Sequence, residues 1–281
     1  GEDRVHEVEP GGDEHEGEFD RLGDAGQPVK RLQRKLLSLG FPPGTIDGEF
    51  GYGTEAAVLA FQRSNGLLAD GIAGPRTLTA LGLSDDDSLP TAIPLFTITV
   101  VSQMFPVTPM RNIKTNLPPV LNALVQADLV DSPMVLTALA TIRAETESFE
   151  PIAEYPSRFN SSPNGHLFDL YDHRTDLGNQ GPPHGERFRG RGYIQLTGRF
   201  NYGKYGAAIG LGSSLVTKPD QASDPQIAAR LLAAFLKDKE RPIKEALLGD
   251  DLAAARRLVN GGAHGLERFR EAYTTGLQSI S

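Results

Sequence analysis

One turn motif occurs twice near the start of the chain. Its copies read DGEFGYGT from Asp47 and DGIAGPRT from Asp70. Glycine permits the positive φ of a tight turn, the aspartate can accept hydrogen bonds from nearby backbone amides, and the threonine can cap a following helix. Apolar residues recur at helical spacing around the copies: Val29, Leu32, Leu36, Ala57, Val58 and Phe61. The pattern predicts a small three-helix module over residues 22–83, with a second helix following Thr54.

This module resembles the peptidoglycan-binding domain of bacterial and phage wall hydrolases. The resemblance rests on residues spread over about 60 positions, among them Leu32-Gln33, Asp47-Gly48, Phe61-Gln62, Asp70-Gly71-Ile72 and Gly74-Pro75. It implies a non-catalytic domain that holds the protein on peptidoglycan, which is therefore the expected macromolecular partner.

The chain has 281 residues, which is long enough for two domains. Its charge and composition indicate where the tail and linker lie and which partners are not expected. The net charge of −8 lies in residues 1–20, where Arg4 is outnumbered by Glu2, Asp3, Glu7, Glu9, Asp13, Glu14, Glu16, Glu18 and Asp20. Residues 1–21 are therefore predicted to be a disordered acidic tail. No basic patch indicates a nucleic-acid partner, and no apolar run is long enough for a membrane span. Residues 84–96, with an acidic run and prolines, are predicted to be a linker.

The absence of cysteine excludes disulfides, thiolate zinc sites and a cysteine nucleophile. No apolar segment follows Gly1, so no signal peptide is predicted within this chain.

Residues 97–281 are predicted to be a second, mostly helical domain. Helices are expected at about 98–104, 117–129, 133–148, 224–239, 250–259 and 265–277. Ser132-Pro133 and Asp224-Pro225 each pair a capping side chain with a proline at the first helical position. The stretch 150–192 has no sustained period, and so long a loop in a compact domain is usually functional.

Glu145 is the first catalytic candidate. It lies at the edge of an apolar helical stripe that consists of Val135, Leu139 and Ile142. Partial desolvation there favours the protonated carboxyl that a general acid needs. Glu147 and Glu150 are expected to face water. A glutamate at a helix edge is more often solvated or ion-paired, so this position alone does not assign a function.

A glycine-rich block at 188–203, FRGRGYIQLTGRFNYG, matches neither GxGxxG nor GxxxxGK[ST], so no nucleotide site is expected. Together with RAETESF at 143–149 and Asn260-Gly261-Gly262, the block resembles glycoside hydrolase family 19, the lysozyme-like helical fold of some chitinases and many phage-type endolysins. Residues 171–179 are most similar to the endolysin branch. The resemblance implies a mainly α chain with a lysozyme-like catalytic domain over 97–281.

The same resemblance implies that Glu145 is the general acid and Glu154 the general base of an inverting hydrolysis without a metal or other cofactor. Such a pair stands ~6.5–9.5 Å apart, which leaves room for a water molecule. The residues implied in binding the sugar or the attacking water are Arg191, Tyr193, Gln195, Thr197, Asn201, Asn260 and Arg268. Each of these residues could instead have a purely structural role. Arg191 and Arg268 could form ion pairs, Gln195 and Thr197 could bond to buried backbone groups, and Asn260 could only end a helix. The aromatic side chains could stack on sugar or belong to the core: Tyr155, Phe159 and Tyr193.

Two departures from the family pattern are present. Ala144 stands where the family usually has histidine, so the surroundings of the acid differ. The chain also has no tryptophan for a chitin platform, which favours peptidoglycan as the substrate. We therefore expect hydrolysis of the MurNAc–GlcNAc bond of peptidoglycan by a monomer at the bacterial cell wall, in the periplasm or outside the cell. The alternatives are a family 19 chitinase using the same residues, a non-catalytic wall-binding protein, and a zinc amidase or peptidase. The zinc enzyme would need convergent histidines, and the six histidines show no metal-ligand spacing.

Overall fold

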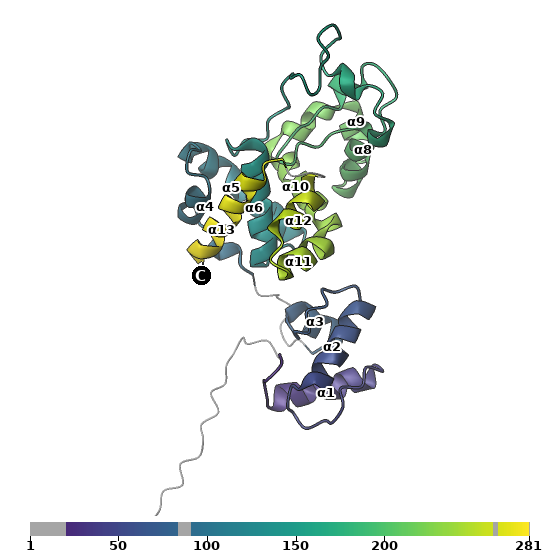
Figure 1. The fold of residues 1–281 in the computed structure, drawn as a ribbon, viewed down its shortest axis with the longest axis vertical. Coiled ribbons are helices and arrows are strands. Elements are labelled where there is room, and N and C mark those ends of the chain that lie inside the picture. Colours follow the sequence, from purple (N-terminus) through teal and green to yellow (C-terminus); the bar gives the residue numbers. More distant parts are fainter. Residues whose placement is uncertain (1–20, 84–90, 261–263, 281) are drawn as a thin grey trace, which may run out of the picture. The chain divides into compact units, whose positions relative to one another are not determined.

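The computed structural model describes residues 21–83, 91–260 and 264–280. The chain divides into two compact units, Gly1–Leu89 and Pro90–Ser281 (Figure 1). The described residues form helices and turns with isolated β-bridges and no strand, which confirms the prediction of a mainly α chain. Residues 1–20 of the predicted tail and 84–90 of the predicted linker lie outside the described residues. Among the described helices, none is long and apolar enough to cross a membrane.

The N-terminal unit contains the three helices predicted for it. They are α1 (Gln27–Ser38), α2 (Tyr52–Ser64) and α3 (Pro75–Leu81). Their shared hydrophobic core consists of Val29, Leu32, Leu36, Phe50, Ala57, Val58, Phe61, Ala73 and Leu81. The second helix begins at Tyr52, two residues before the threonine that was expected to precede it.

A buried glutamine organises the first copy of the repeated turn. Gln33 Nε2 donates hydrogen bonds to Asp47 Oδ1 and to the carbonyl of Glu49, both at 3.0 Å, and to Thr54 Oγ1 at 3.1 Å. The backbone amide of Gly48 donates to Gln33 Oε1 at 2.9 Å. One side chain therefore satisfies four polar groups of the turn.

Gln62 repeats this arrangement in the second copy. Its Nε2 donates to Asp70 Oδ1 at 2.8 Å, to the carbonyl of Ile72 at 2.9 Å and to Thr77 Oγ1 at 3.1 Å, while Gly71 N donates to its Oε1 at 3.0 Å. The sequence repeat is therefore a repeat of one hydrogen-bond network.

The predicted role of the glycines and aspartates in these turns is confirmed, whereas that of the threonines is wrong. Gly48 and Gly71 have φ of 87° and 76°. Asp47 Oδ1 accepts from Glu49 N, and Asp70 Oδ1 accepts from Ile72 N, each at 2.9 Å. The N-cap positions are Gly51 and Gly74, which make no side-chain cap hydrogen bond. Thr54 and Thr77 are the third residues of α2 and α3, within the first turn, where their hydroxyls accept hydrogen bonds from Gln33 and Gln62.

Replacing Gln33 by leucine is expected to lower the free energy of unfolding of the N-terminal unit by about 2 kcal/mol or more. The change leaves the amide of Gly48 and the hydroxyl of Thr54 buried without their partner, and each such loss costs ~1–3 kcal/mol. Urea unfolding of residues 22–83, which have their own core, measures the effect. Gln27→Leu, at an exposed position of the same helix, is the control and should stay within ~0.5 kcal/mol. Equal losses in the two variants would contradict the role of the network.

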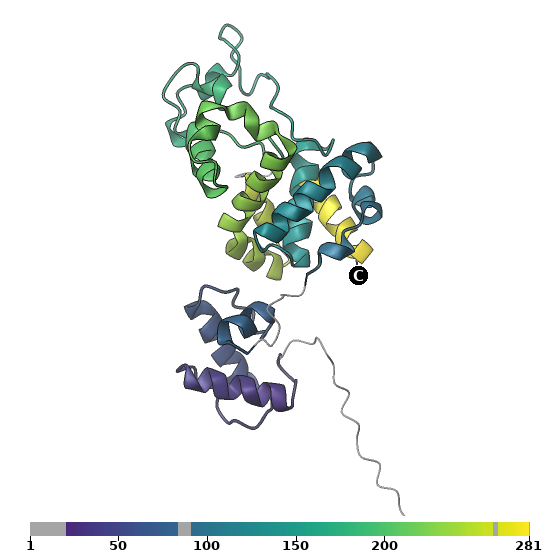
Figure 2. The same ribbon diagram turned by 180° about the vertical axis from the view of Figure 1, so that it is seen from behind.

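The C-terminal unit is built around α6 (Ser132–Thr146). Every residue from Met134 to Ala144 is buried, so the expectation of an apolar stripe with Glu145 at its edge is wrong. The helix is covered by its contacts with α4 (Ile98–Met104), α10 (Pro225–Asp238), α11 (Glu240–Leu248) and α13 (Leu266–Ile280) (Figures 1 and 2). The cap of α6 is Asp131, which accepts from Met134 N, one residue before the predicted cap. Asp224 caps α10 as predicted.

Several elements differ from the sequence-based expectation. Helix α5 (Met110–Gln126) begins seven residues before the predicted start at 117. Pro118 and Pro119 therefore lie inside the helix and not in its first turn. Helices α8 (Arg199–Ala208) and α11 were not predicted, whereas α12 (Leu252–Asn260) was. The linker ends before residue 96, since Phe96 is buried in the core of the C-terminal unit and Ala92 N donates to the carbonyl of Val130.

A long irregular segment connects α6 with α8, as predicted for 150–192. It contains only short elements: η2 (Asp169–Tyr171), η3 (Thr175–Leu177) and α7 (His184–Arg187). Figures 1 and 2 show this segment together with α8 and α9 (Ser214–Thr217) at the opposite end of the unit from α4 and α13. That end has its own hydrophobic cluster around Phe188, Leu196, Tyr202, Tyr205 and Leu231.

Candidate active site

Glu145 lies in the last turn of α6 and pairs with a fully buried arginine. Arg256 of α12 donates from Nη2 to Glu145 Oε1 at 2.6 Å; the Glu145 side chain is 10% exposed and that of Arg256 is 0% exposed. Arg256 also donates to the carbonyl of His264 from Nε at 3.0 Å and from Nη2 at 2.8 Å. Its Nη1 has no hydrogen-bond partner among the described residues. Glu145 is therefore more buried than its position in the sequence indicated, and an opposite charge lies against it.

The chain leading into α13 approaches the end of α6 closely. Gly265 has φ of 71°, and a side chain there would lie 3.1 Å from Ala144 Cβ and 3.4 Å from Arg256 Nη2. Ala144 is itself 2% exposed, so a larger side chain at this position would have to displace its neighbours. Asn260, the last residue of α12, donates to the carbonyl of His264 at 3.3 Å. The two glycines after Asn260 lie outside the described residues.

Arg268 pairs with Glu147 and not with Glu145. Its Nη1 donates to Glu147 Oε2 at 3.1 Å, and Arg143 binds the other oxygen. The Glu147 side chain is 43% exposed and Glu150 is exposed, so both lie at the surface as predicted.

Glu154, in the irregular segment, is held by three hydrogen-bond donors. Its Oε1 accepts from Asn160 Nδ2 and from the Tyr171 hydroxyl, both at 2.9 Å, and its Oε2 accepts from Gly190 N at 3.1 Å. The Glu154 amide in turn donates to the carbonyl of Gly190 at 2.8 Å. These donors hold the Glu154 carboxylate in one orientation.

Gly190 lies where the predicted site residues meet. A side chain at this position would lie 2.9 Å from Gln195 Oε1, 3.2 Å from Glu154 Oε2 and 3.3 Å from Thr197 Oγ1, so any larger residue here would displace these polar groups. Gln195 has a left-handed backbone, with φ of 48°, and its Nε2 donates to the carbonyls of Ile152 and Gly192. Asn201 Nδ2 donates to the carbonyl of Thr197 at 2.8 Å. The structure therefore brings Gln195, Thr197 and Asn201 together beside Glu154.

Two predicted substrate-binding residues are buried. Arg191 is 2% exposed and bonds to the Tyr202 hydroxyl at 2.9 Å and to Asp220 at 2.7 Å. Tyr193 is 0% exposed and lies against Phe149, with ring centroids 6.2 Å apart. Both side chains are covered by other residues of the unit, so the structure shows them in packing contacts and their predicted role in binding substrate stays a prediction. They hold the glycine-rich block in place.

A cavity of about 320 Å³ lies beside Glu154. Its lining residues are Ile152, Ala153, Glu154, Tyr155, Pro156, Leu167, Phe168, Glu186 and Arg189. Tyr155 and, a little further along the chain, Phe159 are 73% and 74% exposed, which excludes the alternative that they belong to the core. Exposed aromatic faces next to a cavity are suited to stacking against sugar rings.

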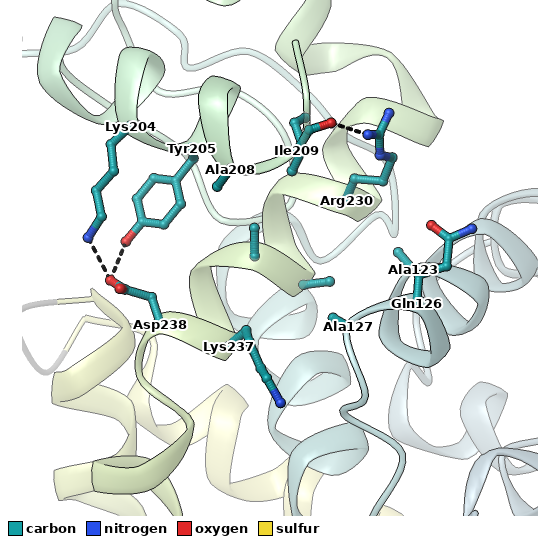
Figure 3. A pocket seen from close by; sticks show the side chains of 12 residues that line it. Ala123, Gln126, Ala127, Lys204, Tyr205, Ala208, Ile209, Arg230, Lys237 and Asp238 are labelled. Carbon is teal, nitrogen blue, oxygen red and sulfur yellow. Dashed lines mark hydrogen bonds and ion pairs between the residues drawn. The ribbon is translucent and has the colours of Figure 1, made fainter. Parts of the chain in front are cut away.

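A larger cavity of about 520 Å³ lies between α5, α8 and α10 (Figure 3). Figure 3 shows Asp238 accepting from Lys204 and Tyr205 at one end and Arg230 donating to the carbonyl of Ile209 at the other. None of the predicted site residues lines this cavity. We therefore place the candidate active site at Glu154.

Three residues of the site were missed in the sequence: Asn160, Tyr171 and Arg256. Asn160 and Tyr171 belong to a segment without periodicity. Tyr171 opens the stretch 171–179 that resembles the endolysin branch, but that resemblance gave it no role, and no local signal marks Asn160. Arg256 had a usable signal, since it falls at helical spacing between Leu252 and Val259, on the apolar face of α12. Among the described residues, no group of three or more histidine, aspartate or glutamate side chains could hold a metal ion.

The N-terminal unit matches a known family. Residues 25–81 match the family described as "Putative peptidoglycan binding domain". The chain therefore carries a peptidoglycan-binding domain. The match covers the repeated turns and the buried glutamines, and it confirms the peptidoglycan-binding domain predicted from the sequence.

Curated relatives share short stretches with the chain. N-acetylmuramoyl-L-alanine amidase CwlM of Mycobacterium tuberculosis is 50% identical over 56 residues, covering 20% of this chain and 14% of that protein. The zinc D-Ala-D-Ala carboxypeptidase of Streptomyces albus G is 46% identical over 74 residues, covering 24% and 28%. Endochitinase At2g43620 of Arabidopsis thaliana is 38% identical over 79 residues, covering 28% and 26%. The chain spans less than a third of the length of each of these relatives.

Two solved structures are similar over larger parts of the chain. Chitinase C from Streptomyces griseus HUT6037 has a TM-score of 0.49 and 20% identity, covering 71% of this chain and 82% of that chain. The Burkholderia AP3 phage endolysin has a TM-score of 0.29 and 20% identity, covering 94% and 99%.

Proposed function

We propose that this protein is a modular cell-wall lysin that hydrolyses the MurNAc–GlcNAc bond of peptidoglycan by an inverting mechanism. The observation that carries the proposal is Glu154, a carboxylate held by three donors beside a cavity, in a chain that also carries a peptidoglycan-binding domain. The binding domain keeps the catalytic unit close to the wall. This raises the local concentration of the glycan substrate without altering the active site.

In this mechanism Glu154 removes a proton from a water molecule as the water oxygen bonds to the anomeric carbon. The bond from that carbon to the leaving oxygen breaks, and Glu145, which has first taken up a proton from solvent, donates that proton to this oxygen. The reaction ends with Glu145 ionised, so the guanidinium of Arg256, 2.6 Å away, stabilises the charge that develops on the acid. Solvent then restores both protonation states.

The remaining polar residues lie beside one or the other carboxylate. Gln195, Thr197 and Asn201 surround the Glu154 side of the site, where they would hold the water and the sugar. Asn260 and Arg268 lie on the Glu145 side, through their contacts with His264 and Glu147. Tyr155 and Phe159 provide the exposed aromatic faces.

Mass spectrometry of products from purified sacculi tests the proposal. We expect muropeptide-bearing fragments with MurNAc at the reducing end, because cleavage on that side of MurNAc leaves its anomeric carbon free. Soluble chitin oligomers should be poor substrates. Fragments that end in reducing GlcNAc, or sacculi that remain intact, would contradict the assigned bond.

Chitin hydrolysis with the same two carboxylates is the second candidate function. It is favoured by the identity shared with the Arabidopsis endochitinase. Efficient cleavage of chitin oligomers alongside intact sacculi would select it.

A further inference from the structure

The two side chains that bind Glu154 Oε1 both come from the irregular segment between α6 and α8. Asn160 Nδ2 and the Tyr171 hydroxyl each donate to this oxygen at 2.9 Å. A carboxylate has about four lone-pair positions, two on each oxygen. The two side chains occupy both positions on Oε1, and Gly190 N occupies one on Oε2. One position, on Oε2, is left.

We propose that Asn160 and Tyr171 are positioning residues that hold the Glu154 carboxylate in one orientation and turn its one free lone pair toward the attacking water. This inference rests on the proposed function, in which Glu154 is the general base. The irregular segment then has a definite role, because it folds around the carboxylate and presents it in one orientation.

Asn160 is held so that its amide cannot turn away. The residue is 0% exposed, and its Oδ1 accepts from Ser157 N at 2.7 Å and from Ser161 Oγ at 2.9 Å. Its Nδ2 donates to the carbonyl of Tyr155 as well as to Glu154. A flip of the amide would break all of these bonds, so the orientation of the Nδ2 donor is fixed by its surroundings.

Tyr171 is a donor over the whole pH range in which a glycosidase works. Burial, and then the charge of Glu154, raise the pKa of its hydroxyl to about 12. Its backbone carbonyl is fixed by Asn179 Nδ2 at 2.8 Å. The other charged groups around the pair are Arg174, which pairs with Asp176, and Glu186 and Arg189, which line the cavity with Glu154.

Tyr171→Phe tests the proposal in the full-length protein, since it removes only the hydroxyl oxygen. Losing one of the two donors on Oε1 lets the carboxylate turn away from the water, so kcat on sacculi should fall about tenfold while KM stays unchanged. Asn160→Asp, which places an acceptor where Nδ2 donated, should lower kcat further, again without a change in KM.

Tyr205→Phe is the matched control. The Tyr205 hydroxyl also donates to a carboxylate, Asp238 at 3.0 Å, but in the larger cavity away from Glu154. Its kcat and KM should match those of the unmodified protein. A Tyr171→Phe variant with unchanged kcat would overturn the inference while leaving the proposed function intact. Unchanged sugar release by Glu154→Gln would instead remove the proposed function.

Discussion

Glu154→Gln is expected to lower kcat/KM on sacculi by ~10²–10⁴-fold, because a positioned general base contributes that much to the rate. The amide keeps the size of the side chain and can still meet Gly190 N through its oxygen, but it cannot accept a proton from water. Glu145→Gln should cause a loss of the same size, since the amide cannot protonate the leaving oxygen. Release of reducing sugar from sacculi measures both effects.

Glu150→Gln is the control for this pair of variants. Glu150 lies between the two carboxylates in the sequence and is exposed, so its activity should stay within a few fold of that of the unmodified protein. An NMR time course of the first-formed sugar should show inverted anomeric configuration. Retained configuration, or an inactive Glu150→Gln with an active Glu154→Gln, would show that the carboxylates are assigned wrongly.

The Glu145–Arg256 pair is expected to give the largest change in stability. Arg256→Met and Glu145→Gln should each lower the free energy of unfolding by about 3–5 kcal/mol, because each leaves the other group buried without its counter-charge. The double variant should lose much less than the sum of the two, since it leaves no unpaired charge. Urea unfolding of the full-length protein measures the three changes.

A surface ion pair provides the comparison. Lys204 and Asp238 lie 2.7 Å apart with side chains 42% and 41% exposed, so Lys204→Met should cost no more than ~1 kcal/mol. Additive losses for Glu145 and Arg256 would mean that the two side chains do not interact energetically. Activity of Glu145→Gln has to be measured well below its unfolding temperature, so that lost catalysis is not confused with lost folded protein.

The amino-acid sequence determined the binding domain almost completely. The repeated Asp-Gly turns and the apolar spacing are local signals, because a tight turn depends on a few neighbouring residues and a helix on its own periodicity. Even there, only the tertiary structure showed the role of the threonines. Thr54 and Thr77 accept hydrogen bonds from glutamines that lie 21 and 15 positions away in the chain. Capping was the local interpretation, and it failed because a buried donor from another helix satisfies each hydroxyl.

In the C-terminal unit the sequence located both candidate carboxylates, the long loop over 150–192 and the glycine-rich block. It did so through motifs and not through contacts, and it therefore assigned Arg191 and Tyr193 to the substrate although they are buried. Burial depends on which helices cover a residue, and spacing along one segment does not carry that information. Helix α6 shows the same limit, since its buried surface extends all round once four other helices pack on it.

Only the tertiary structure decided what surrounds the two glutamates. Arg256 meets Glu145 across 111 positions of sequence, and Gly190 meets Glu154 across 36. Asn160 and Tyr171 reach the same carboxylate from a segment that has no periodicity to mark them. The sequence identifies Glu145 and Glu154 as carboxylates. Their charge partner and hydrogen-bond donors come together only when distant segments of the chain fold against each other.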